Sequence, residues 1–301
     1  MRITVFGGAG FLGSHACDKL SEAGHELTVF DIRKSEWLCA GQKSITGDIL
    51  DENAVAAAVQ GADVVYNFAG IADIGEANLR PVDTVKYNVL GNVNVLEACK
   101  NAGVKRFIFA SSLYVYSKGG GFYRCSKQAS ELYVENYRAE YGLEYTILRY
   151  GSLYGPRADM RNGIYRFVRQ AMESGKISYY GTARALREYI HVHDAADCTV
   201  EILGEKYANT NIVLTGSQPM RITDLFTMIS EMLGGGVEFE YLEDTENKHY
   251  EITPYSFNPK LGHKMSPRLS IDLGQGILAT IEEIYRDMNP DEVKLEGYIM
   301  K

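Results

Sequence analysis

The sequence predicts an α/β fold, a doubly wound parallel sheet with a smaller, interwoven C-terminal domain. Short apolar runs alternate with amphipathic helical patterns through the first half of the 301-residue chain. Strands separated by helices of this length form βαβ units with parallel strands. A glycine-rich turn lies between the first apolar run and the first helical pattern. After Arg149 the alternation loosens into turns and shorter strands, which indicates a change of architecture.

Each element follows from its hydrophobic pattern. Strands are predicted at residues 3–6, 26–30, 63–68, 106–110 and 145–148, and helices at 14–23, 53–59, 87–101 and 123–141. The second half predicts strands at 188–192 and 211–214, an apolar helix at 223–233 that glycines 234–236 terminate, and an acidic surface strand and loop at 238–246. We expect residues 1–150 and 187–216 to form the larger domain, and 151–186 and 217–301 the smaller one.

Composition narrows the class of protein. Asp plus Glu number 39 against 31 Lys plus Arg, a formal net charge of −8, so the chain lacks the positive face that nucleic acids and anionic lipids bind. No apolar run approaches the roughly 18 residues of a membrane span, and the first strand starts too early to leave room for a signal peptide. The five cysteines are scattered and odd in number, which disfavours a disulfide framework or a zinc site. We expect a cytoplasmic protein without nucleic-acid or membrane partners.

The glycine-rich turn has the pattern G-x-x-G-x-x-G, in the segment Gly7-Gly-Ala-Gly10-Phe-Leu-Gly13. Glycines there permit a positive φ and a close approach of backbone N–H groups to a pyrophosphate, which the N-terminus of the following helix also attracts. Asp31 ends the second predicted strand. Its carboxylate can bind both ribose hydroxyls and repels a 2′-phosphate, so NAD is favoured over NADP. The neighbouring Arg33 weakens this preference, and a turn cap is the alternative role of Asp31.

Two further segments lie where a dinucleotide would pass. Gly47-Asp48-Ile49 follows the presumed third strand and offers a carboxylate and an apolar side chain to the adenine ring. Asn67-Phe-Ala-Gly70 ends the next strand with small residues, as a backbone that passes close beneath a cofactor needs. Ordinary turn chemistry is the alternative for both segments.

A tyrosine and a lysine carry the candidate chemistry. In Tyr123-Arg-Cys-Ser-Lys127 the two side chains share one face of the predicted helix. A phenol with a pKa of about 10 needs roughly 4 kcal/mol of preferential phenolate stabilisation to act as a base at neutral pH, which a lysine and a nicotinamide's positive charge would supply. Ser111 and Ser112 follow a buried strand and offer a hydroxyl to orient a substrate alcohol. Alone this spacing is usual for a solvated helix face, but after the glycine turn and the double serine it predicts a catalytic site.

With these motifs in order, the chain resembles the extended short-chain dehydrogenase/reductase family, in its NAD-dependent nucleotide-sugar epimerase/dehydratase branch. The resemblance covers nearly the whole chain. It rests on Gly7 to Gly13, Gly47 to Ile49, Asn88 to Cys99, Ser111-Ser112, Tyr123 to Lys127, Leu148 to Arg157 and Arg187 to Asp194. It implies a Rossmann-like NAD-binding larger domain, a nucleotide-sugar-binding smaller domain and a homodimer formed through helices 87–101 and 123–141.

The resemblance also implies a role for each matching residue. Tyr123 is the expected acid/base, Lys127 binds the nicotinamide ribose and tunes Tyr123, and Ser112 hydrogen-bonds the reacting oxygen, with Ser111 as a possible substitute. NAD is expected to contact Gly7, Gly10, Phe11, Leu12, Gly13, Asp31, Arg33, Asp48, Ile49, Phe68, Ala69, Gly70, Asn88, Tyr123, Lys127 and Tyr150. The nucleotide-diphosphate sugar is expected to contact Ser111, Ser112, Tyr123, Ser152, Arg187 and His249. Arg187 matches the residue that grips the pyrophosphate; a surface ion pair with Glu188 is the alternative.

Several residues depart from the family pattern. The connection from Ser112 to Tyr123 is short and contains three glycines, which predicts an open or reshaped sugar pocket. Ser152 replaces the usual Asn, and the C-terminal phosphate motif is missing, with Lys248 or His249 as a possible replacement or as solvated loop residues. His191 and His193 alternate on one predicted strand, but they lack an identifiable third ligand, and we expect no metal.

The function predicted is an NAD-dependent nucleotide-sugar 4-epimerase that acts through a 4-keto intermediate. The alternative is a 4-dehydrogenase that releases the keto sugar. A 4,6-dehydratase is disfavoured because Leu113 and Tyr114 stand where the dehydratases have an Asp-Glu pair. A non-catalytic NAD(P) sensor is also disfavoured, because Tyr123 and Lys127 are intact.

Overall fold

The computed structural model describes residues 1–243, 250, 252–254, 263–265 and 270–290. Its main element is a sheet in the order β13-β10-β6-β5-β4-β1-β2-β3, in which every described pair of neighbours is parallel. Its strands are β1 (Arg2–Phe6), β2 (Glu26–Asp31), β3 (Lys43–Thr46), β4 (Val64–Asn67), β5 (Arg106–Ser112), β6 (Glu144–Tyr150), β10 (Thr210–Leu214) and β13 (His263–Met265). The predicted parallel α/β sheet is confirmed.

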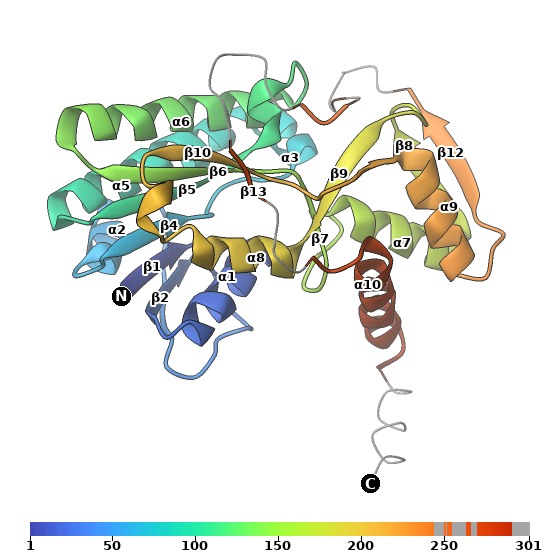
Figure 1. Ribbon diagram of the computed structural model, residues 1–301, viewed down its shortest axis with the longest axis horizontal. Coiled ribbons are helices and arrows are strands. Elements are labelled where there is room, and N and C mark those ends of the chain that lie inside the picture. Colours follow the sequence, from blue (N-terminus) through green and yellow to red (C-terminus); the bar gives the residue numbers. More distant parts are fainter. Residues whose placement is uncertain (244–249, 251, 255–262, 266–269, 291–301) are drawn as a thin grey trace, which may run out of the picture.

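Helices cover both faces of this sheet (Figure 1). One face carries α1 (Phe11–Glu22) and α8 (Val192–Glu201), and the other carries α2 (Glu52–Val59), α5 (Gly91–Ala102) and α6 (Gly121–Tyr141). Successive strand side chains point to opposite faces, so Val5 and Phe6 of β1 enter two different apolar cores. The sheet is therefore buried on both sides, as the continuous apolar runs of its strands require.

The first helix begins three residues earlier than its apolar pattern predicts. Its helical hydrogen bonds start with the N–H of Ser14, which donates to the carbonyl oxygen of Gly10 at 3.0 Å. The helix therefore starts inside the glycine turn, and its N-terminus faces the end of β1.

The predicted helix at 87–101 is two elements, a π-helical segment η1 (Val85–Leu90) and α5. Within η1, the buried side-chain amide of Asn88 accepts a hydrogen bond from Ile71 N–H (2.7 Å) and donates to Ile71 O (2.9 Å). The π-helical segment η1 thus carries Asn88, which fixes the loop after β4 through its two hydrogen bonds to Ile71.

The C-terminal part has a core of its own. β7 (Ser152–Tyr154), β9 (Leu186–His191) and β11 (Pro219–Arg221) form a small sheet, and β8 (Lys176–Tyr180) pairs in parallel with β12 (Glu238–Leu242). Three helices pack on these strands: α7 (Gly163–Ser174), α9 (Ile222–Met232) and α10 (Leu273–Met288). The rings of Phe167 and Phe226 meet edge-on in this core, with centroids 4.9 Å apart.

The two parts are interwoven. β13, from the range predicted for the smaller domain, forms an edge of the large sheet, whereas β9, from the range predicted for the larger domain, pairs with β7 and β11. Short helices complete the described chain: α3 (Ile74–Leu79), α4 (Pro81–Thr84), η2 (Leu113–Tyr116) and η3 (Glu205–Tyr207). Within the described ranges, none of the helices combines the length and apolarity needed to span a membrane.

Candidate active site

A cavity of about 1120 Å³ opens along the carboxyl edge of the large sheet. Its wall includes Gly7 just after β1, Phe68 just after β4, Ser112 at the end of β5 and Tyr150 at the end of β6. Ligands of doubly wound sheets bind at this edge, where the strand order reverses, here between β1 and β4. The same cavity continues into the C-terminal part, as far as Arg187 and Tyr250.

The glycine turn forms a close-fitting cradle at one end of this cavity. Gly7 has φ +76, and a Cβ atom there would lie 2.5 Å from Ala69 N; a Cβ on Gly13 would lie 2.1 Å from Gly7 O. No side chain caps α1 at Gly10, so the first N–H groups of the helix have no side-chain acceptor where Gly10 to Gly13 line the cavity. Only glycine fits here, and the arrangement suits a dinucleotide's pyrophosphate.

Asp31 and Arg33 meet the glycine turn from the end of β2. Asp31 Oδ2 accepts a hydrogen bond from Ala9 N–H (3.0 Å), and the Arg33 guanidinium donates to Ala9 O (3.3 Å). Asp48 Oδ1 accepts from Leu50 N–H (2.9 Å). These contacts hold the turns around the site, and the ribose and adenine roles of these carboxylates stay predictions.

Two other predicted cofactor residues are engaged inside the protein. Ile49 is buried against α5, where a Cβ on Gly91 would lie 2.7 Å from its Cγ2. The second amide proton of Asn88 goes to Ser126 Oγ (2.9 Å). Within the described chain, the predicted cofactor residues that do not line this cavity are Asp31, Arg33, Asp48, Ile49, Ala69 and Asn88.

Ser112, Tyr123 and Lys127 come together in the middle of the cavity. Tyr123 and Lys127 lie one turn apart on α6, and the Lys127 ammonium sits 5.8 Å from the centre of the Tyr123 ring. Lys127 Nζ donates to the carbonyl oxygen of Ala110 at 2.7 Å. The Ser112 hydroxyl lies near enough to the Tyr123 phenol to lower its pKa.

Burial shifts the pKa values of this pair in opposite directions. It raises the pKa of Tyr123 to about 12, against a lowering by the neighbouring Ser112 hydroxyl. It lowers the pKa of Lys127 to about 8, against a raising by the charge of Glu131. Both shifts favour the neutral forms, as expected for groups withdrawn from water. Tyr123 therefore needs a further positive charge nearby to become a base at neutral pH.

The two adjacent serines point to different partners. Ser111 is 3% exposed, and its hydroxyl donates to Glu131 Oε1 at 2.5 Å. The side chain of Ser112 instead reaches Tyr123. Ser111 lies at the cavity wall, but its hydroxyl is already committed to a buried carboxylate, so Ser112 is the better candidate for the reacting oxygen.

Tyr114 and Tyr250 stand beside the short connection from Ser112 to Tyr123. The Tyr114 ring packs edge-on against Tyr123, with centroids 6.2 Å apart, and tilted against Tyr250, 4.7 Å apart. Gly120, with φ +93, allows this packing, because a Cβ there would lie 2.7 Å from Tyr114 Cδ1. Half-buried Tyr114 and buried Tyr250 thus form this part of the cavity wall, and neither was among the predicted site residues.

Arg187 lies at the far end of the cavity and is 6% exposed. Its guanidinium stacks 4.4 Å from the centre of the Tyr250 ring and donates to Tyr179 OH at 3.2 Å. The alternative of a surface ion pair with Glu188 is wrong, because Glu188 is buried and accepts from Thr215 Oγ1 (2.6 Å) and Lys264 Nζ (3.5 Å). Ser152 lines the cavity near Tyr250, whose pKa it lowers against the raising by burial, whereas His249 lies outside the described residues.

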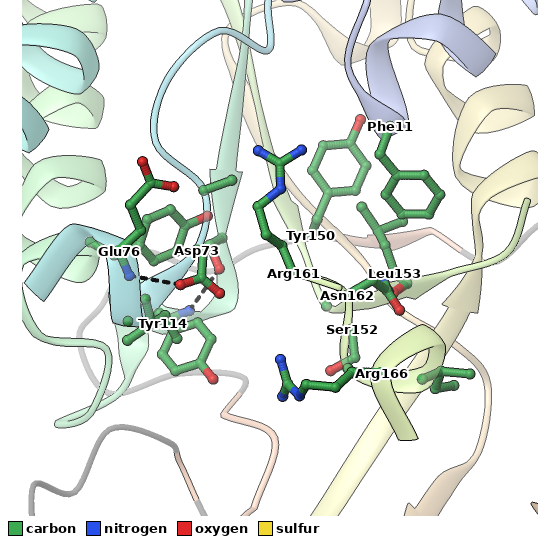
Figure 2. A pocket seen from close by; sticks show the side chains of 18 of the residues that line it. Phe11, Asp73, Glu76, Tyr114, Tyr150, Ser152, Leu153, Arg161, Asn162 and Arg166 are labelled. Carbon is green, nitrogen blue, oxygen red and sulfur yellow. Dashed lines mark hydrogen bonds between the residues drawn. The ribbon is translucent and has the colours of Figure 1, made fainter. Parts of the chain in front are cut away.

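Charged side chains face each other across the middle of the cavity. Figure 2 shows Asp73 and Glu76 on the side of α3, and Arg161 and Arg166 on the side of α7. Asp73 Oδ1 caps α3 by accepting from Glu76 N–H at 2.7 Å. Sequence reasoning overlooked these four residues, since no local motif connects the start of α3 with the start of α7.

The two histidines of the predicted strand do not share a strand face. His191 ends β9, whereas His193 lies in the first turn of α8, and both rings pack near each other with centroids 4.9 Å apart. Burial lowers the pKa of His191 to about 4. Among the residues that the structure describes, no three His, Cys, Asp or Glu side chains gather as metal ligands.

Comparison with known proteins decides the family. A model of the NAD dependent epimerase/dehydratase family matches residues 3–214. The chain belongs to this family. Over 246 residues this family member is 31% identical to UDP-N-acetyl-alpha-D-glucosaminuronate decarboxylase from Bacillus cytotoxicus, across 72% of this chain and 75% of that protein.

Two solved structures extend the likeness over nearly the whole chain. UDP-glucose 4-epimerase from Thermotoga maritima, with UDP-glucose, has a TM-score of 0.82 and 27% identity, and the match covers 96% of this chain and 100% of that one. UDP-glucose 4-epimerase from Thermus thermophilus, in complex with NAD, has a TM-score of 0.82 and 25% identity, with 95% and 99% covered. This epimerase/dehydratase-family protein is an NAD-dependent enzyme, and its glycine cradle fits that cofactor. Its relatives include both epimerases and decarboxylases.

Proposed function

We propose that this enzyme is a nucleotide-sugar 4-epimerase that oxidises the C4 hydroxyl of its substrate and reduces the resulting 4-keto sugar from the other face. The observation that carries the proposal is the meeting of Ser112, Tyr123 and Lys127 in a cavity that is continuous with the glycine cradle. The larger domain would bind NAD and the smaller one the nucleotide. The similarity to 4-epimerase structures over nearly the whole chain supports this choice.

The proposed mechanism assigns one task to each side chain. NAD, held at the cradle of Gly7, Gly10 and Gly13, would supply the acceptor and donor for the C4 hydride. The Tyr123 phenolate takes the proton of the C4 hydroxyl and later gives it back to the C4 oxygen. The Ser112 hydroxyl, which lies beside the Tyr123 phenol, orients that oxygen. The Lys127 ammonium favours the phenolate through its positive charge, held in place by Ala110 O.

At the far end of the cavity, Arg187 is proposed to bind the substrate's diphosphate. Its stacking on Tyr250 and its bond to Tyr179 fix the guanidinium before the ligand arrives, which limits the entropy lost on binding. Ser152 is proposed to contact the substrate from the same wall. The contact predicted for His249 stays a prediction.

The test is Tyr123→Phe, assayed against a panel of UDP-, GDP-, CDP- and dTDP-sugars with product NMR. Loss of a proton-transfer group should reduce kcat by about 10²–10⁴-fold, while NAD binding, measured by calorimetry, stays within a few-fold of wild type. The control is Tyr141→Phe, on the same helix but exposed and outside the cavity lining, which should keep full activity. Full activity of Tyr123→Phe would overturn the assigned chemistry.

The second candidate function is a 4-dehydrogenase that releases the keto sugar. The short connection from Ser112 to Tyr123 favours it, because a reshaped pocket can lose the intermediate before hydride returns. The same assays separate the candidates. An epimerase gives an inverted product without net NADH absorbance, a dehydrogenase accumulates NADH, and a decarboxylase, tested with uronate sugars, releases carbon dioxide.

We also propose that the enzyme is a cytoplasmic homodimer. Exposed apolar side chains gather on α3, α4, η1 and α6, at Leu79, Val82, Val85, Leu90 and Leu132. A face of this kind is typical of a protein–protein contact, and all five cysteines are free thiols, which suits a reducing compartment. Sedimentation that finds only monomer at micromolar concentration would exclude the dimer.

A further inference from the structure

A buried ion pair lies directly behind the catalytic groups. Arg149 on β6 and Glu131 on α6 have side chains that are only 1% and 5% exposed. They meet in two parallel hydrogen bonds, Nε to Oε1 at 2.9 Å and Nη2 to Oε2 at 2.7 Å. Neither residue lines the cavity within the described part of the chain, so neither contacts a ligand there.

The pair holds the chain on both sides of Ser112. Before it, Ser111 donates its hydroxyl to Glu131 Oε1. After it, Tyr116 in η2 receives a hydrogen bond from Arg149 Nη1, and its ring lies 4.7 Å from the guanidinium carbon. Ser112 itself caps the start of η2, because its hydroxyl accepts from Tyr114 N–H at 3.3 Å. The segment that carries Ser112 is thus fixed at both ends to one ion pair.

The pair also stands next to Lys127. Glu131 follows Lys127 by four residues on α6, so the two side chains lie on the same helix face, one turn apart. The Lys127 ammonium is buried and has a carbonyl oxygen, that of Ala110, as its hydrogen-bond acceptor. Glu131 supplies negative charge on the side away from the cavity, and its attraction opposes the loss of the lysine's proton.

Stability alone is a weak reason for such a pair. A buried Arg–Glu pair often contributes no more than apolar residues of similar volume, because both charges lose their hydration. Here the pair binds Ser111 and Tyr116, which lie on either side of Ser112, and Glu131 lies one helical turn from Lys127. We propose that Glu131, clamped by Arg149, is a positioning residue that fixes Ser112 and keeps the Lys127 ammonium charged during the reaction. This inference rests on the proposed roles of Ser112 and Lys127.

The test compares Glu131→Gln with wild type, both saturated with NAD. The titration of Lys127 is followed by NMR of enzyme labelled at lysine Cε, with the signal assigned from Lys127→Met. Removing one charge about one helical turn away, at an effective dielectric constant of about 20, should lower the titration midpoint by about two pH units. The alkaline limb of the pH–kcat profile should move down by the same amount, with KM changed less than about twofold.

Arg106→Met is the matched control. Arg106 is an equally buried arginine at the opposite end of β5, where it bonds the carbonyl oxygens of Ile202, Leu203 and Gly204 and the carboxylate of Glu205. Its loss should lower stability without moving the Lys127 midpoint. An unchanged midpoint in Glu131→Gln, or an equal shift in Arg106→Met, would overturn the inference.

A double variant covers the case in which Glu131→Gln does not fold. Glu131→Met with Arg149→Met removes both charges and keeps most of the volume, so it leaves no unpaired ion in the core. The inference expects a folded enzyme with the lowered Lys127 midpoint, and a folded double variant with the wild-type midpoint overturns it. Because the midpoint is measured without turnover, failure of this inference is distinguishable from failure of the proposed function, which Tyr123→Phe tests.

Discussion

Replacing Lys127 with methionine should change how the stability of the NAD-free protein depends on pH. Burial lowers the pKa of Lys127 from 10.5 to about 8, so between these values the unfolded chain binds a proton that the folded protein does not. By linkage, the free energy of unfolding rises with pH across this window, by about 3 kcal/mol in all. Methionine is similar in volume and does not titrate, so the variant lacks this rise.

The assay is urea unfolding followed by circular dichroism. Between pH 7 and about pH 9.5 the linkage gives a gain of about 2 kcal/mol for wild type relative to Lys127→Met. The pH dependence of this difference is the measured quantity, because the titration of independent groups cancels between the two proteins. The absolute stability of the variant also contains the lost hydrogen bond to Ala110 O.

Lys105→Met, which replaces an exposed lysine, is the control and should leave the pH dependence as it is in wild type. The reasoning would be refuted if the stability difference between wild type and Lys127→Met moved by less than about 0.5 kcal/mol over this pH range. Lys127 would then titrate as it does in the unfolded chain, and burial would not have displaced its pKa.

Two further predictions concern the cofactor end of the cavity. Gly13→Ala would place a Cβ atom 2.1 Å from Gly7 O, so we expect NAD affinity, measured by calorimetry, to fall by about 100-fold or more, since backbone atoms must move. Gly204→Ala, at a φ of −59 and with its nearest atom at 3.4 Å, should bind NAD as wild type does. Asp31→Asn keeps an acceptor for Ala9 N–H but loses its charge, so NAD affinity should fall about tenfold while NADP affinity rises; an unchanged NAD/NADP ratio would remove Asp31 from the ribose site.

The cofactor end of the site was predictable because its signal is local. Gly7, Gly10 and Gly13 lie within one turn, and their spacing between a strand and a helix is itself the structural requirement. The same holds for Tyr123 and Lys127, whose separation of four residues places them on one helix face. In both cases the chemistry is encoded within seven consecutive residues, and the surrounding fold only has to preserve it.

Other parts of the site depend on residues far apart in the chain. Tyr114 and Tyr250 meet only because η2 and a residue after β12 pack against each other. Tyr114 follows the Ser111-Ser112 motif closely, but nothing in the sequence pairs it with Tyr250. α7, by contrast, had a readable signal. Its buried residues Ile164, Phe167, Val168 and Ala171 have the spacing of an amphipathic helix, which the glycines and turns around it obscured.

Glu131 is an intermediate case. The spacing from Lys127 extends the Tyr123–Lys127 face by one more turn, and Arg149 is a charged residue at the end of an apolar strand. A charged side chain is unusual at both positions. The two meet only because α6 packs on the paired strands β5 and β6. A charged residue in a pattern that predicts burial is therefore a signal for a partner, although the sequence does not say which.

The opposing pKa shifts of Tyr123 and Lys127 explain why deprotonation of Tyr123 is coupled to cofactor binding. In the protein alone, burial holds the pKa of Tyr123 at about 12, so the phenol keeps its proton at neutral pH. A positive charge brought into the cavity lowers the pKa of Tyr123. The same charge repels the Lys127 ammonium, whose pKa burial has already lowered. The negative charge of Glu131, on the far side of Lys127, offsets that repulsion without reaching Tyr123 directly. By reciprocity, loss of the Tyr123 proton should then strengthen binding of oxidised NAD relative to its neutral, reduced form.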